Sequence, residues 1–190
     1  MKRIVAAFAI SVIAITLHAQ EALNPTIKRG VKIHYTVNTG DGQEIPLLIS
    51  VDSVAPKYVK LGWNIEGMGA GGWVMKENSL NNATRGWWGE PVAGSDMDIA
   101  DEQLVLLLSK AQWNAIMKDK KMEYDQQQYH VKQPNEQQLL KLNGKSLNVI
   151  MVESLNGASR IWVLNNPQFP AVVKIEGNPM GIDLWVTSIN

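Results

Sequence analysis

Hydrophobic and polar residues alternate along the part of the chain that follows residue 30. Between residues 31 and 37, apolar side chains occupy every second position, which is the period-two pattern of a strand with one buried face. An Asp41-Gly42 step separates this segment from residues 44–51, and such a step predicts a hairpin between the two. Residues 58–65 alternate in the same way and predict a third strand.

Two stretches near the middle of the chain depart from this alternation. Ser79 or Asn78 is placed to cap a short helix over residues 80–85, which Gly86 would end. Residues 101–109 read "DEQLVLLLS", and this nearly continuous apolar run predicts a strand that is covered on both faces. We therefore expect one weak helix and one buried strand in this region.

A helix from Ser109 to Lys121 has the clearest local signals. Ser109 and Gln112 have the spacing of a capping box. An apolar stripe follows on one face, and lysines gather near the C-terminal end, where the helix dipole favours them. The stripe is Trp113, Ile116 and Met117, and the lysines are Lys118, Lys120 and Lys121.

Short strands and tight turns fill residues 139–189, which predicts an antiparallel meander. The turns are expected at Asn143-Gly144, at Asn156-Gly157 and at Gly177-Asn178-Pro179. Because no linker interrupts the chain, residues 20–190 are expected to form a single domain. The predicted fold is mainly β: an antiparallel barrel or half-barrel of about ten strands, with one clear helix and one short helix.

Residues 1–19 have the pattern of a cleaved secretory signal peptide. Lys2 and Arg3 precede an apolar run over residues 4–17, and the small Ala19 offers a cleavage site. The run is too short to remain as a membrane span. We expect the mature protein to be exported to the periplasm or the extracellular space, without a stable membrane span.

Charge and cysteine content exclude several classes of function. Without Lys2 and Arg3, residues 20–190 hold 16 basic and 18 acidic residues, a formal charge of −2. This lacks the basic surface that nucleic acids require. The absence of cysteine excludes disulfides, thiolate catalysis and cysteine-bound zinc, and it also excludes a lipoprotein, whose lipid is carried by a cysteine. No cofactor is expected.

Gly67, Gly69 and Gly72 have the GxGxxG spacing of a dinucleotide-binding loop. That loop requires a preceding strand, a following helix and an acid about twenty residues further on. Here residues 73–75 are strand-like, and no acid ends a second parallel strand, because the corresponding region reads "GWWGEP". We therefore interpret the glycines as a backbone reversal between two strands rather than as a nucleotide site.

No catalytic or metal motif stands out. The carboxylates between Asp96 and Glu102 lack the spacing of a calcium loop, and the solvated turn is the simpler interpretation. His34 and His130 belong to no metal-binding pair, and no GxSxG sequence is present. We expect a non-enzymatic protein; a hydrolase that assembles serine, histidine and aspartate from distant segments is the alternative.

Seven tryptophans are the most unusual feature of the composition. Trp87 and Trp88 are adjacent in a turn-rich segment, where at least one should be partly exposed. Exposed aromatic pairs suit a sugar ring, a lipid tail or a partner surface. A loop that plugs one end of the barrel explains the pair equally well.

Two segments resemble a family of exported bacterial domains of unknown function. They are "LNVIMVES…RIWVLNNPQFPAVVKIEGNPMGIDLWVTSI" near the end of the chain and "DEQLVLLLSKAQWNAI" before it. The resemblance implies a β-barrel-like fold similar to the half-barrels of periplasmic lipoprotein carriers, with helices at or across the opening. It implies no catalytic residues.

We expect a domain that binds an apolar or amphipathic ligand, such as a lipid-like molecule, or an envelope partner. The helix at Ser109–Lys121 and the Trp87–Trp88 segment would frame the opening. The candidate ligand-binding residues are Trp63, Trp73, Met75, Trp87, Trp88, Trp113, Ile116 and Met117.

Two alternatives remain open. One is a carbohydrate-binding or glycan-acting protein that uses Trp87 and Trp88 together with carboxylates such as Glu90 and Asp96. The other is a filled barrel that acts only as a structural module.

Overall fold

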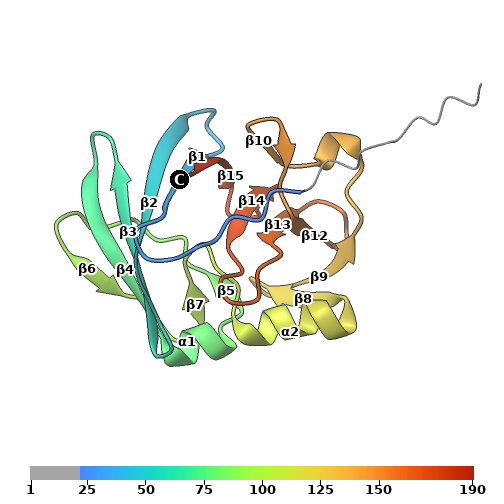
Figure 1. Ribbon diagram of the computed structural model, residues 1–190, viewed down its shortest axis with the longest axis horizontal. Helices are drawn as coiled ribbons and strands as arrows, with labels where there is room; N and C mark the ends of the chain where they lie inside the picture. The colour runs from blue at the N-terminus through green and yellow to red at the C-terminus, as the bar shows by residue number, and fades with distance from the viewer. Residues whose placement is uncertain (1–21) are drawn as a thin grey trace, which may run out of the picture.

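The alternating segments of the sequence form the strands of one large sheet. The computed structural model describes residues 22–190, so the predicted signal peptide lies outside the described residues. The sheet has eleven strands in the order β6-β4-β3-β2-β1-β15-β14-β13-β12-β9-β8. In Figure 1, β2, β3, β4 and β6 lie on one side and β12, β9 and β8 on the other, with β1, β15 and β14 between them. The mainly β prediction is confirmed.

The strands of this sheet are β1 (Lys32–Asn38), β2 (Glu44–Ala55), β3 (Tyr58–Ile65), β4 (Gly69–Lys76), β6 (Asp96–Asp98), β8 (Lys121–Tyr124), β9 (Gln127–Lys132), β12 (Val149–Ser154), β13 (Arg160–Leu164), β14 (Val172–Glu176) and β15 (Asp183–Ile189). Two small sheets contain β5 (Arg85–Gly86) with β7 (Gln103–Leu104), and β10 (Lys141–Leu142) with β11 (Lys145–Ser146). The helices are α1 (Glu77–Asn82) and α2 (Lys110–Asp119), and η1 (Glu136–Gln138) is a single 3₁₀ turn.

The predicted hairpins and the C-terminal meander are confirmed. β1 pairs with β2, and β2 with β3, in antiparallel register. β12, β13, β14 and β15 follow one another across the sheet. The Asn143-Gly144 step forms the β10–β11 turn, where both residues have the positive φ that a type I′ turn requires. Period-two alternation and local turn residues were therefore sufficient to place most strands.

The first and last strands of the described chain pair in the middle of the sheet. Ile33 on β1 lies opposite Ile189 on β15, and the pairing continues to Asn38 opposite Asp183. This pairing joins the N-terminal hairpins to the C-terminal meander. Across the join, the buried hydroxyl of Tyr35 donates a 2.9 Å hydrogen bond to the carbonyl oxygen of Val172 at the start of β14.

The prediction of an antiparallel barrel or half-barrel holds only in part: the structure is mainly β, but its large sheet is mixed and is not a closed barrel within residues 22–190. β6 pairs with β4 in parallel, so the large sheet is mixed, and β5 pairs with β7 in parallel in a separate small sheet. Residues 77–95, which include α1, connect β4 to β6, and a crossover of this length can return the chain in the same direction. Within residues 22–190, no pairing joins the edge strands β6 and β8, so the strands do not close into a barrel.

One face of the sheet carries most of the hydrophobic core, and we call it the inner face. Directly paired residues point to the same face, which places Ile49 beside both Ile33 and Trp63. The same register continues through Leu184 and Ile175 on the other half of the sheet. All five side chains are buried.

The apolar run at residues 101–109 is not a covered strand. Gln103–Leu104 pairs with β5 and Leu107 forms an isolated bridge with Ala171, but the left-handed backbone of Leu106, with φ of 53°, prevents one continuous strand. The segment instead crosses the inner face. The Val105 amide donates to the sulfur of Met75 on β4, and the carbonyl oxygen of Leu106 accepts from the amide of Val172 on β14. Burial by the sheet on one side explains the apolar run.

The predicted helix at Ser109–Lys121 is confirmed as α2, whereas the short helix, α1, begins earlier in the sequence than predicted. Ser109 caps α2, and the reciprocal hydrogen bonds with Gln112 complete the predicted capping box. α1 begins at Glu77 rather than after Ser79, and the Ser79 hydroxyl donates to the carbonyl oxygen of Lys76. A serine can therefore bond to the preceding turn from inside a helix instead of capping it.

No helix within residues 22–190 is long and apolar enough to cross a membrane.

Candidate functional site

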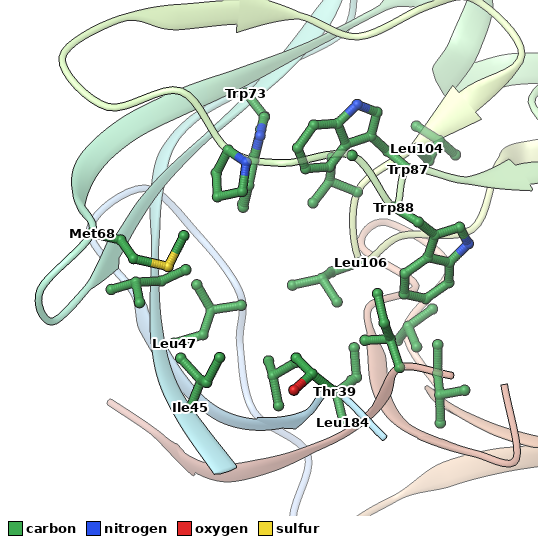
Figure 2. A pocket seen from close by; sticks show the side chains of 18 of the residues that line it. Thr39, Ile45, Leu47, Met68, Trp73, Trp87, Trp88, Leu104, Leu106 and Leu184 are labelled. Atoms are coloured by element: carbon green, nitrogen blue, oxygen red, sulfur yellow. The ribbon is translucent and has the colours of Figure 1, made fainter. Parts of the chain in front are cut away.

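An apolar pocket with a volume of about 210 Å³ lies on the inner face of the sheet (Figure 2). The β1–β2 and β3–β4 hairpins form one side of it. The β14–β15 hairpin, residues 87–91 and 104–106, and Tyr124 on β8 form the rest. The lining residues are Val37, Thr39, Ile45, Leu47, Ile65, Met68, Trp73, Trp87, Trp88, Gly89, Pro91, Leu104, Val105, Leu106, Tyr124, Val172, Ile175, Ile182 and Leu184.

The pocket exists because two kinds of segment meet there. The strands present their inward-facing alternate residues, such as Ile45 and Leu47 on β2. The crossing segment faces them with Leu104 and Leu106. The left-handed backbone at Leu106 separates the β7 pairing from the Leu107–Ala171 bridge, so the segment crosses the sheet without adding a continuous strand.

Three tryptophans pack in a row, and two of them, Trp73 and Trp87, line the pocket. Trp63 on β3 stacks on Trp73 on β4 with ring centroids 5.9 Å apart, and Trp73 packs at a tilt against Trp87 with centroids 5.3 Å apart. Among the described residues, the buried indole nitrogens of Trp63 and Trp73 have no hydrogen-bond acceptor. Unpaired buried donors are costly, so packing of the large rings must outweigh this cost.

Trp88 is held by a turn that is distant in sequence. Its indole Nε1 donates a 2.7 Å hydrogen bond to Oδ2 of Asp125, and Oδ1 of the same carboxylate accepts a 2.9 Å bond from the Gly86 amide. Asp125 and Gln126 form the β8–β9 turn with φ of 49° and 63°. Burial raises the pKa of the Asp125 carboxyl, and the hydrogen bonds from Trp88 and Gly86 oppose that rise.

Among the side chains of residues 22–190, none that lines the pocket is charged. Within the same residues, the hydroxyl groups in the lining belong to Thr39 and Tyr124. The Thr39 hydroxyl donates to the Asp41 carboxylate at the mouth, 2.7 Å away. Burial raises the pKa of the Tyr124 hydroxyl well above its ordinary value, so that group is neutral. The lining can therefore bind through apolar and aromatic contacts and not through an internal ion pair.

Three of the eight candidate ligand-binding residues line this pocket: Trp73, Trp87 and Trp88. Trp63 supports Trp73 from behind, and Met75 is fully buried beneath the crossing segment. The three candidates on α2 lie elsewhere. Trp113 and Ile116 are buried in the core, whereas Met117 is 47% exposed, and none of the three lines the pocket.

The remaining lining residues were not identified from the sequence. Ile45 and Leu47 belong to the predicted alternation, which marks them as inward-facing but cannot show which inward-facing residues border empty space. Leu184 lies 137 positions beyond Leu47 in the chain, and only the β1–β15 pairing brings their strands together. No local pattern carries that information.

The GxGxxG stretch is the turn of the β3–β4 hairpin, as predicted. Gly67 and Gly69 have φ of 80° and 106°, and Gly72 lies inside β4 rather than before a helix. The backbone of residues 92–95 passes closely over Gly71: a Cβ there would lie 2.7 Å from the carbonyl oxygen of Val92. Both the turn and the close approach therefore require glycine.

Two of the four carboxylates predicted to form a solvated turn, Asp96 and Asp98, form ion pairs on the surface. Asp96 binds the ammonium of Lys60 at 2.7 Å, and Asp98 binds that of Lys76 at 2.6 Å. Residues 22–190 contain no group of three or more histidine, cysteine or carboxylate side chains placed to hold a metal ion. Glu90 is exposed beside the pocket, whereas His34 is half-buried within β1.

Comparison with protein-family models, curated proteins and solved structures found no match to the chain. The resemblance to exported bacterial domains thus remains a prediction from the sequence, and a functional interpretation has to be derived from the geometry of the pocket.

Proposed function

We propose that this chain is an exported, non-enzymatic domain that binds an apolar or amphipathic small molecule on the inner face of a half-barrel. The observation that carries the proposal is the pocket itself, whose lining is almost entirely aliphatic and aromatic. Binding pockets for small molecules typically combine such a lining with a few polar groups. Thr39 and Tyr124 are the corresponding hydroxyl groups in this pocket.

The size of the pocket limits what it could hold. An apolar cavity of roughly 150 Å³ accepts benzene. At about 210 Å³ this pocket suits a somewhat larger group, such as one short acyl chain or a single ring with substituents, rather than a complete two-chain lipid. A longer ligand would extend through the mouth, where Met68 is exposed.

The sheet topology supports the half-barrel interpretation. The edge strands β6 and β8 remain unpaired with each other, and the crossing segment at residues 103–108 covers part of the inner face. A partly covered, unclosed sheet leaves an apolar surface that a ligand can complete, and burial of apolar area is the expected source of affinity.

The first test is a matched pair of tryptophan substitutions on β2. Ile45→Trp places an indole in the pocket, whereas Val54→Trp adds the same group at an exposed position of the same strand, outside the lining. Titration of N-phenyl-1-naphthylamine, followed by its fluorescence, should show binding to the wild-type protein. We expect about tenfold weaker binding to Ile45→Trp and unchanged binding to Val54→Trp.

Mass spectrometry of the natively purified protein provides the complementary measurement. Co-purification of an apolar molecule with the wild-type protein, and its loss from Ile45→Trp, would support the proposal. The absence of any such molecule together with no fluorescence response to the probe would exclude it. Binding of soluble oligosaccharides that is unaffected by Ile45→Trp would favour the glycan-binding alternative instead.

A further inference from the structure

A second apolar pocket, with a volume of about 330 Å³, lies at the other end of β2 from the pocket that Trp73 and Trp87 line. We call them the second and the first pocket. Val54, near the end of β2, pairs with Val59 on β3, and Val59 pairs with the buried Met75 on β4. This register places both valines on the inner face, so the two pockets lie at opposite ends of β2 on the same face.

The crossing segment at residues 103–108 separates the two pockets. Residues 104–106 line the first pocket, whereas residues 107–108 line the second. Leu107 forms an isolated bridge with Ala171, and the Leu108 amide donates a 3.1 Å hydrogen bond to the carbonyl oxygen of Pro170. These contacts hold one wall of the second pocket in place.

Apolar side chains form most of the second pocket. Val54 is 44% exposed, whereas Val59, Leu107 and Phe169 are buried and also contribute to the lining. Three prolines line the pocket as well, and they offer no amide N–H to a ligand. This lining suits a flexible acyl chain, which gains affinity by burying apolar area.

Lys110 supplies the one charged side chain in this lining within residues 22–190. It is exposed, and no ion pair among the described residues includes it. Lys110 begins α2, whose first turn has no acidic side chain, so the helix dipole adds to the positive charge of the lysine. The second pocket therefore combines an apolar lining with a single unpaired cation, which the lining of the first pocket lacks within the same residues.

We infer that the second pocket binds an anionic amphiphile of the fatty-acid type: a carboxylate on a single acyl chain. The carboxylate pairs with the Lys110 ammonium, and the chain contacts Val54, Leu107 and Phe169. This site is separate from the one in the proposed function and does not depend on it.

A cationic amphiphile of the same length is disfavoured at this site. Its headgroup would meet the Lys110 ammonium, and no carboxylate within residues 22–190 contributes to the lining. Repulsion of this kind discriminates between ligands of equal apolar area.

Three probes with the same eight-carbon tail separate charge from apolar contact: octanoate, octanol and octyltrimethylammonium. Two-dimensional NMR of the isotope-labelled mature chain at low ionic strength reports the affinity and the position of each. We expect octanoate to shift the amide signals of Leu107, Lys110 and Phe169 and to bind more tightly than octyltrimethylammonium. The indole signals of Trp73 and Trp87 report on the first pocket, because these side chains line that pocket and not the second.

Lys110→Gln tests the role of the charge. We expect about three- to fivefold weaker binding of octanoate, as for the loss of one exposed ion pair, and unchanged binding of octanol. Lys110→Arg retains the charge and should retain most of the affinity. Lys118→Gln is the matched control, because Lys118 is exposed on the same helix and lies outside the lining.

The two tryptophan variants of β2 separate the pockets. Val54 lines the second pocket and Ile45 the first, so Val54→Trp should weaken octanoate binding several-fold and Ile45→Trp should leave it unchanged. N-phenyl-1-naphthylamine has no anionic group to pair with Lys110, so its binding to the first pocket should still be unaffected by Val54→Trp.

The outcomes separate this inference from the proposed function. No binding of octanoate, octanoate shifts confined to the first pocket, or equal or tighter binding of octyltrimethylammonium would overturn the inference. An equal loss of octanoate affinity in Lys110→Gln and Lys118→Gln would overturn it as well. None of these results changes the binding of N-phenyl-1-naphthylamine to the first pocket, on which the proposed function is tested.

Discussion

Asp125 joins two parts of the chain from the tip of a tight turn. Its backbone has the left-handed conformation that aspartate tolerates better than most residues, and its two carboxylate oxygens bind the Gly86 amide and the Trp88 indole. Its own amide donates to the carbonyl oxygen of Thr84. These contacts compensate for the backbone strain and fix one aromatic border of the pocket.

Replacement of Asp125 by alanine should loosen this border. The substitution leaves two donors, on Gly86 and Trp88, without an acceptor and keeps the unfavourable backbone conformation. We expect the free energy of unfolding to fall by about 1–3 kcal/mol and acrylamide to quench tryptophan fluorescence more strongly. Urea unfolding at pH 7 measures the first effect. Asp125→Asn retains an acceptor oxygen and the turn preference, so a loss equal to that of alanine would contradict the assignment.

The same carboxylate should also make stability depend on pH in a definite direction. Burial raises the pKa of Asp125 above its ordinary value of 3.8, so the folded protein binds this proton more tightly than the unfolded chain. Its stabilising contribution is present below that value and is lost as the pH rises through the raised pKa. The unfolding free energy of the wild type minus that of Asp125→Asn should therefore be larger at acidic pH than at pH 7, and a constant difference would exclude the effect.

The β3–β4 hairpin shows at the level of one element why its glycines are needed. Gly67 and Gly69 permit the reversal, and Gly71 permits the close approach of residues 92–95. That segment follows the pocket residue Pro91, so the packing at Gly71 also positions part of the pocket lining. The GxGxxG pattern of a phosphate-binding loop is explained here by the backbone requirements of the hairpin alone.

Alanine at Gly71 should affect both stability and the pocket. Its Cβ would lie 2.7 Å and 2.8 Å from the carbonyl oxygens of Val92 and Ser95, and a backbone contact cannot relax easily. We expect a loss of about 1–3 kcal/mol in unfolding free energy, together with weaker binding of N-phenyl-1-naphthylamine.

Gly67→Ala provides the contrast for this prediction. A Cβ there meets no atom within 4 Å, so only the backbone conformation is strained and N-phenyl-1-naphthylamine should bind as before.

Neither NAD nor ATP should raise the melting temperature of the wild-type protein, and a clear rise would restore the nucleotide hypothesis.

The whole molecule is organised around the pairing of β1 with β15. Contacts between strands about 150 positions apart form the centre of the sheet, so neither half has a complete inner face alone. The Tyr35 hydroxyl reinforces this junction through Val172. Burial raises the pKa of Tyr35 well above its ordinary value, which keeps the hydroxyl protonated as a donor.

Tyr35→Phe should therefore weaken the junction without changing its shape. Loss of the hydroxyl leaves the buried carbonyl of Val172 without this donor, at a cost of about 1–2 kcal/mol measured by urea unfolding. Tyr58→Phe is the matched control, because Tyr58 is exposed on β3 and its substitution should change stability by less than about 0.5 kcal/mol. Equal losses of unfolding free energy in the two variants would show that the Tyr35 hydrogen bond does not contribute to stability.

The amino-acid sequence by itself determined the features that depend on neighbouring residues. Alternation placed the β1–β3 strands, Asn-Gly steps placed the later turns, and Ser109 with Gln112 placed the start of α2. Each of these rests on contacts within a few positions, which a local pattern records.

Tertiary structure alone decided the rest. The parallel β4–β6 pairing, the crossing segment at residues 103–108 and the meeting of β1 with β15 all depend on contacts between distant segments. An apolar run such as residues 104–108 reads the same whether it lies within a sheet or across one, because burial requires apolar side chains in both cases. The pocket follows from those long-range contacts, so only the folded chain defines it.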